Sequence, residues 1–111
     1  MSGRYHEEIY KLKAGLCRTF ADPKRLMIID ELRDNEKSVG DISASMGINQ
    51  SLISRHLAVL RQSGVVEARR AGTTIYYSLS DKQICQTCDM MHQILVRQIE
   101  KTRKITEQII T

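Results

Sequence analysis

Hydrophobic residues recur every three or four positions along most of this chain, a spacing that predicts amphipathic helices. In the second such stretch, for example, Leu26, Ile29 and Leu32 fall on one side, as the buried face of a helix requires. The breaks between stretches are polar or contain glycine. The pattern predicts five helices, over residues 4–20, 23–34, 39–46, 50–63 and 81–109.

Capping residues support these boundaries. Asp22 followed by Pro23 is a favourable helix start, because the aspartate accepts free N–H groups and proline needs none in the first turn. Ser38 with Asp41 has the spacing of a capping box. Ser80 with Gln83 has the same spacing, and it predicts the start of the last helix.

The stretch between the fourth and fifth helices has a different pattern. Val65–Arg70 and Thr74–Leu79 are rich in β-branched and aromatic residues, and residues 71–73 between them contain Gly72. Tyr76 and Tyr77 alternate, so one is expected to face the core and the other solvent or a phosphate. The chain is therefore predicted to be mainly α with one small β-hairpin.

Residues 39–63 have the form of a helix-turn-helix. The first helix ends at Gly47, which accepts the positive φ of a sharp turn, and Asn49 can cap the second. Ile53, Leu57 and Leu60 share the buried face of that second helix. The opposite face is short, polar and basic and is suited to reading base edges in a major groove. Its members are Gln50, Ser51, Ser54 and Arg55.

Charge is distributed in keeping with a DNA-binding role. The formal net charge is +4, and residues 49–80 hold four arginines against the single acidic residue Glu67. Such a basic stretch suits phosphate contacts. His56 is expected near the DNA or packed beneath the hairpin. The residues predicted to contact phosphates or the minor groove are Arg61, Arg69, Arg70 and Thr73.

Composition limits the remaining possibilities. The 111 residues predict a single domain, 1–111, and the charged first twenty residues do not resemble a signal peptide. No apolar run approaches the length of a membrane span, and three cysteines do not suit a secreted disulfide framework, so we expect a cytoplasmic protein. No phosphate-binding loop or catalytic constellation is found, which argues against an enzyme. A winged-helix module that binds only proteins is the alternative, and the basic face argues against it.

The last predicted helix carries more apolar surface than a small domain needs. Roughly 29 residues would extend about 43 Å. Leaving such a stripe in water would be unusual, so a second subunit is expected to cover it. We therefore predict a homodimer formed by the first and last helices. The stripe consists of Ile84, Cys88, Met91, Leu95, Ile99, Ile105 and Ile109.

The chain resembles the ArsR/SmtB family of metal- and stress-responsive repressors over roughly residues 12–95. The resemblance lies in three segments: residues 20–26, the second helix of the helix-turn-helix (residues 50–63, the recognition helix) and the hairpin. It implies a winged helix-turn-helix fold, binding to operator DNA and the same dimer. The matching motifs are Phe20-Ala21-Asp22-Pro23-Lys24-Arg25-Leu26, Ser54-Arg55-His56-Leu57, Gly64-Val65-Val66, Arg69-Arg70-Ala71-Gly72 and Tyr76-Tyr77-Ser78-Leu79.

Cysteines are the candidate signal receptors. Cys85, Cys88 and His92 lie on one flank of the last helix, and Cys17 of the first helix can join them if the two helices pack. With the imidazole, and Asp89 as a further oxygen donor, the set suits zinc, cadmium or lead. Three thiolates alone suit arsenite or antimony, and a thiol pair suits oxidants or reactive sulfur. Buried cysteines that only pack in the core are the alternative.

The sensor sites usual in the resembled family do not match these residues. The third helix, residues 39–46, has no cysteine, and the second helix lacks the cysteine of sulfide-responsive relatives. Asp89 and His92 have the wrong spacing for the histidine-rich site of the last helix. The sequence therefore predicts a repressor that releases its operator on a thiol-reactive or metal signal at Cys17, Cys85 and Cys88, with inert cysteines as the alternative.

Overall fold

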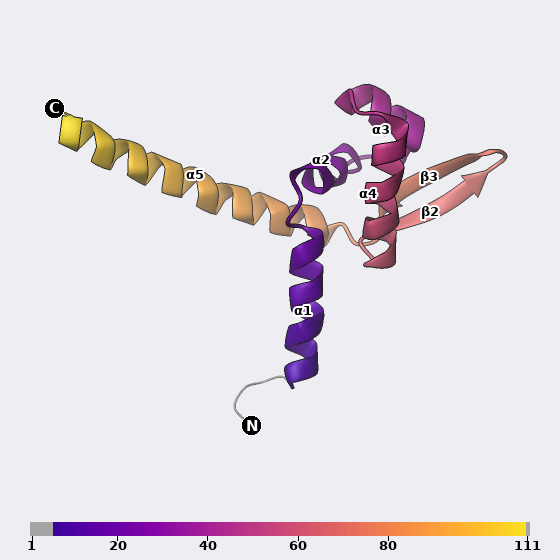
Figure 1. Ribbon diagram of the computed structural model, residues 1–111, viewed down its shortest axis with the longest axis horizontal. Helices are drawn as coiled ribbons and strands as arrows, with labels where there is room; N and C mark the ends of the chain where they lie inside the picture. The colour runs from indigo at the N-terminus through magenta and orange to yellow at the C-terminus, as the bar shows by residue number, and fades with distance from the viewer. Residues whose placement is uncertain (1–5, 111) are drawn as a thin grey trace.

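The computed structural model describes residues 6–110 as five helices and a three-stranded antiparallel sheet (Figure 1). The helices are α1 (Glu7–Thr19), α2 (Pro23–Glu31), α3 (Val39–Met46), α4 (Gln50–Gln62) and α5 (Gln83–Ile110). The strands are β1 (Lys37–Ser38), β2 (Val66–Ala71) and β3 (Thr74–Leu79). The predicted winged helix-turn-helix is confirmed. The first helix was predicted from residue 4, and residues 4 and 5 lie outside the described part.

The core lies where α2, α3 and α4 meet the start of the sheet. The buried side of α4 is the one that the sequence predicts, with Ile53, Leu57 and Leu60 fully buried. Burial of such apolar side chains is the main stabilising contribution to a small domain. The buried cluster consists of Ile28, Ile29, Leu32, Ile42, Ile53, Leu57, Leu60, Val65 and Val66.

Helix caps follow the sequence with one exception. The Asp22 carboxylate accepts the N–H groups of Lys24 and Arg25, and Ser38 and Asp41 form the reciprocal capping box. The predicted box of Ser80 and Gln83 is wrong. The Asp81 carboxylate accepts the Gln83 N–H at 2.9 Å, while the Ser80 hydroxyl donates to the carbonyl of Val65. The Ser80 hydroxyl is therefore directed to the carbonyls of Gly64 and Val65 at the base of the sheet, and the neighbouring aspartate replaces it as the cap.

The sheet contains a strand that the sequence does not predict. Its order is β1-β3-β2, and β1 pairs with β3 through Lys37 opposite Tyr77 and Ser38 opposite Tyr76. β2 and β3 form the predicted hairpin, which is the wing of the fold and is closed between Ala71 and Thr74. Since β1 precedes α3 directly, it attaches the base of the wing to the helix-turn-helix.

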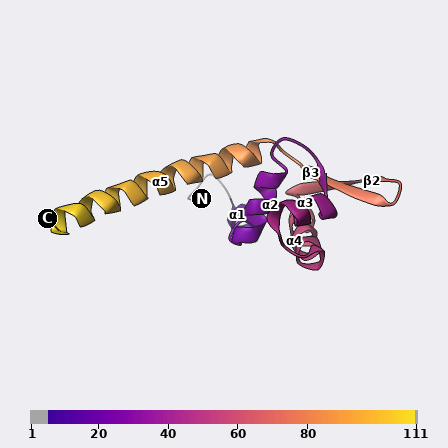
Figure 2. The ribbon, with the colours of Figure 1, turned by 90° about the horizontal axis from the view of Figure 1, so that it is seen from above.

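The two terminal helices extend from this body. α5 leaves it on the side opposite the wing, as both views show (Figures 1 and 2). Every residue from Asp89 to Ile110 is exposed, including Ile99, Ile105 and Ile109. On α1, Leu12 and Leu16 are exposed and only Thr19 is buried. Within residues 6–110, no helix combines the length and apolar character needed to cross a membrane.

Candidate nucleic-acid interface and thiol region

The outer face of α4 presents the predicted base-reading residues. Gln50, Ser51, Ser54 and Arg55 are all exposed, on the side of the helix away from Leu57 and the core. Short side chains at 51 and 54 leave room for close approach to a groove. Arg55 has no ion pair or side-chain hydrogen bond with any described residue, so its guanidinium is available for a bidentate base contact.

Local sequence fixes the position of α4. Gly47, at φ +67°, ends α3 in the left-handed region, and Asn49 caps α4 by accepting the Leu52 N–H at 2.9 Å. The far end is held by Ser63, whose hydroxyl lies 2.8 Å from that of Thr19 at the end of α1. The recognition helix is thus held at both ends, and its C-terminus contacts the first terminal helix directly.

The two arginines of the wing have different surroundings. Arg69 makes a two-point ion pair with Glu36, in which Nε donates to Oε2 at 3.1 Å, and its guanidinium lies 5.1 Å from the centroid of the Tyr76 ring. This pair lowers the pKa of Glu36 and raises that of Arg69. Arg70 and Thr73 are exposed near the tip, and Arg70 has no such partner among the described residues. Arg69 therefore links the wing to the segment before α3, whereas the guanidinium of Arg70 remains exposed.

His56 and Arg61 complete the predicted DNA-proximal set. His56 is half-buried and lies near Asp22 at the start of α2. It therefore lies away from the most exposed face of α4. Arg61 is exposed at the last turn of α4 and can reach a phosphate from there.

The three cysteines occupy different environments. Cys17 is exposed on α1, Cys85 is buried at the start of α5, and Cys88 is half-buried one turn later. Burial is the main cause of a raised pKa of the Cys88 thiol, and the neighbouring Cys85, Asp30 and Asp89 raise this pKa further. No group of three His, Cys, Asp or Glu side chains within residues 6–110 is arranged to hold a metal ion. Within residues 6–110, Cys85 and Cys88 lie one helical turn apart, and Cys17 does not join them in a metal-binding group.

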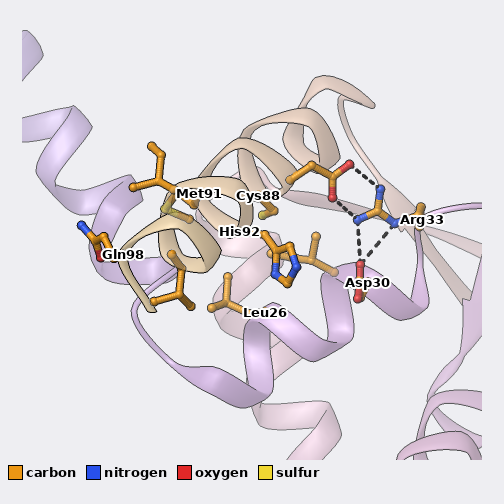
Figure 3. Close-up of a pocket in the computed structure, with 11 residues that line it drawn as sticks. Leu26, Asp30, Arg33, Cys88, Met91, His92 and Gln98 are labelled. Atoms are coloured by element: carbon orange, nitrogen blue, oxygen red, sulfur yellow. Dashed lines mark hydrogen bonds and ion pairs between the residues drawn. The ribbon is translucent and has the colours of Figure 1, made fainter. Parts of the chain in front are cut away.

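Cys88 lines a groove of about 670 Å³ between α2 and α5 (Figure 3). Its walls are mainly apolar, and His92 projects from α5 toward α2. Arg33 closes one end by binding two carboxylates. It bridges Asp30 of its own segment and Asp89 of α5. The apolar residues of the walls are Leu26, Ile29, Met91, Ile94 and Leu95.

No pattern in the sequence marks Arg33, Asp30 or Glu36 as functional residues. Arg33 and Asp89 are 56 positions apart, and Glu36 and Arg69 are 33 apart, so no local spacing marks either pair. The only available signal was the surplus of six acidic over four basic residues in residues 21–48. That surplus did not show which basic residues the acidic ones would meet.

Comparison with known proteins agrees with this geometry. Residues 22–68 match the family model described as bacterial regulatory protein, arsR family. The chain is 35% identical over 104 residues to the uncharacterized HTH-type transcriptional regulator Rv0081 of Mycobacterium tuberculosis, covering 93% of this chain and 91% of that protein. The crystal structure of Rv0081 superposes with a TM-score of 0.77 over 86% of this chain and 97% of that one.

Two further relatives add information on function and assembly. The biofilm growth-associated repressor of Xylella fastidiosa is 38% identical over 85 residues, which cover 77% of this chain and 75% of the repressor. The homodimeric winged helix-turn-helix DNA-binding domain Mb0332 of Mycobacterium bovis is 27% identical, with a TM-score of 0.77 and coverage of 91% and 95%. The chain belongs to the arsR family of bacterial regulatory proteins.

Membership of the arsR family indicates which part of the molecule meets DNA. Proteins of this family are DNA-binding transcriptional regulators and not enzymes. The exposed face of α4 and the wing are the parts that such a regulator uses on DNA. The groove beside Cys88 lies between α2 and α5 and includes no residue of α4 or the wing.

Proposed function

We propose that this arsR-family regulator is a homodimeric repressor that binds a palindromic operator and releases it on a thiol-reactive or metal signal. The observation that carries the DNA-binding part is the exposed, unpaired face of α4. Gln50 and Arg55 would read bases, with Ser51 and Ser54 allowing close approach. Arg61, Arg70 and Thr73 would contact phosphates. Because its ligand is chromosomal DNA, the protein is expected to act in the cytoplasm.

The homodimer is supported by surfaces that one chain leaves uncovered. Leu12 and Leu16 on α1 and Ile99 and Ile105 on α5 are large, apolar and exposed. Large exposed apolar side chains on helices are typical of subunit interfaces. The homodimeric state of Mb0332 supports the same arrangement here. A dimer would place two α4 helices on two half-sites of one duplex.

The signal is proposed to act at Cys85 and Cys88. The pair lies at the base of α5, where a disulfide or a bound soft ion would alter the packing of α5 on the body. A soft ion such as zinc, cadmium or arsenite needs three or more donors. Since residues 6–110 of one protomer do not assemble them, Cys17 or His92 of a second copy would complete the set. Cysteines that serve only in packing are the alternative, and the response of cysteine variants distinguishes the two.

Selection from a pool of random double-stranded DNA tests the DNA-binding proposal. The purified protein should enrich duplexes with two inverted half-sites whose centres lie about one helical turn apart. Affinity for the enriched duplex should fall steeply as salt rises, because phosphate contacts release counterions. A pool that shows no enrichment would refute the proposal and favour the protein-interaction module.

A further inference from the structure

α5 is fixed to the body only near its beginning. Cys85 is buried and Ile84 and Cys88 pack against the core, whereas everything from Asp89 onward is exposed. The remaining 22 residues form a lever about 33 Å long. A rotation of about 10° at its base would displace its tip by about 6 Å at that length. The few contacts at the base therefore determine where the rest of the helix points.

Arg33 makes the polar contact at this base. Its Nη1 donates to Asp89 Oδ2 at 3.0 Å and its Nη2 to Asp89 Oδ1 at 2.8 Å, a two-point contact that fixes direction as well as distance. Its Nε and Nη2 also donate to Asp30 Oδ1 at 3.2 and 2.8 Å. The guanidinium is thus oriented from both sides, by a carboxylate of α2 and by one of α5.

The same contact lies between the cysteines and the recognition helix. Asp89 follows Cys88 directly in α5, and both line the groove with Arg33 (Figure 3). Asp30 belongs to α2, whose neighbours Ile28 and Ile29 pack in the core with Ile53 and Leu57 of α4. A change in the direction of α5 relative to α2 is therefore also a change relative to α4.

We propose that Arg33 is a positioning residue for operator binding: by bridging Asp30 and Asp89 it fixes the direction in which α5 leaves the DNA-binding body. This rests on the proposed function, in which α5 joins the two subunits. In such a dimer the direction of α5 sets the separation of the two α4 helices, and hence the half-site spacing that the protein accepts. Arg33 does this without touching DNA.

Charge exchange between the two partners tests the proposal. Arg33→Glu and Asp89→Arg should each weaken binding to the duplex selected by the wild type about tenfold, within the usual range for coupling between sites. Each should also change the preferred spacing when one or two base pairs are added to or removed from the spacer. The double variant, which restores a carboxylate opposite a guanidinium, should recover both affinity and spacing to within about twofold.

The design separates positioning from simpler effects. Arg33→Glu lowers the net charge and Asp89→Arg raises it, so a general charge effect would move DNA affinity in opposite directions in the two variants. Loss of the Arg33–Asp89 bridge would instead lower DNA affinity in both variants. Arg33→Gln removes the two-point contact with a smaller change of charge, and it provides the test if a reversal variant does not fold. Thermal melting and sedimentation identify variants that fail to fold or dimerise.

Each outcome is decisive. Wild-type affinity and spacing in folded single variants would overturn the role of Arg33, as would a double variant no better than the weaker single one. A wild-type protein that selects no duplex would instead overturn the proposed function itself. The two failures are therefore distinguished by the wild-type measurement.

Discussion

At the residue scale, the structure distinguishes side chains that the sequence presents as equivalent. Arg69 and Arg70 are adjacent basic residues of the wing, yet only Arg69 is engaged, with Glu36 and Tyr76. Arg70→Ala should weaken binding to specific and non-specific duplexes alike and reduce the slope of log affinity against log salt by about one. Arg69→Ala should leave the slope near the wild-type value. Equal losses of slope would show that Arg69 leaves Glu36 to bind phosphate.

Glu31 gives a prediction for stability. Its carboxylate accepts hydrogen bonds from Lys37 and from Ser45, both at 2.9 Å, and these bonds lower its pKa. A carboxylate with a lowered pKa stabilises the fold while it is ionised, so the contribution is present at neutral pH and disappears as pH falls through that pKa. Glu31→Gln should reduce the free energy of unfolding at pH 7 by about 0.5–1.5 kcal/mol.

Denaturant unfolding at several pH values measures this effect. The difference between wild type and Glu31→Gln should shrink in acid, where the wild-type carboxyl is also neutral. Glu67→Gln is the matched control, because Glu67 is exposed and has no such contacts among the described residues. A Glu31→Gln protein as stable as the control at pH 7 would contradict the assignment.

At the element scale, α5 is the part whose size requires explanation. Its outer half contributes nothing to the core of one chain. Replacing Ile99, Ile105 and Ile109 by serine, or truncating after Leu95, should weaken the dimer and with it operator affinity. The matched control replaces Lys101, Lys104 and Gln108 of the same segment by serine. Sedimentation at low micromolar protein concentration measures the fraction of dimer. If the variant with all three isoleucines replaced by serine is still fully dimeric, these residues have no major role in the dimer.

The elements also show what the sequence could and could not predict. Helices were predictable because periodicity and caps are local, as with Asp22 before α2 and Asn49 before α4. β1 was missed because two residues carry no periodic signal, and its pairing depends on β3. The predicted cap at Ser80 failed because a carbonyl of Val65, distant in sequence, competes for the hydroxyl. Arg33 was missed because its partner Asp89 lies on another helix.

At the scale of the whole molecule, the proposed sensor and the DNA-binding face are separate. Cys85→Ser and Cys88→Ser should leave DNA binding of the untreated protein intact while abolishing release by the inducer, because serine is nearly isosteric but neither forms a disulfide nor binds soft ions well. Cys17→Ser should have the same effect only if a second copy completes the site. Release should be measured with arsenite, cadmium, zinc, peroxide and polysulfide.

The pattern of responses identifies the role of each cysteine. A wild type that ignores all five agents would contradict the thiol-sensor proposal. Full responses in all three variants would show that the cysteines are packing residues, and loss of Cys85 would then only lower stability. A response that depends on Cys85 and Cys88 alone would place the sensor within one protomer.

The most direct test of the central claim, that α4 reads operator DNA, is the affinity of wild type and Arg55→Ala for the selected duplex and for a scrambled duplex of equal length. The wild type should prefer the selected duplex by about 10³-fold or more. Arg55→Ala should lose about 1–3 kcal/mol on the selected duplex, the worth of a bidentate base contact, and far less on the scrambled one. Equal affinity of the wild type for the two duplexes, or an Arg55→Ala protein that binds the selected duplex as tightly as the wild type, would contradict it.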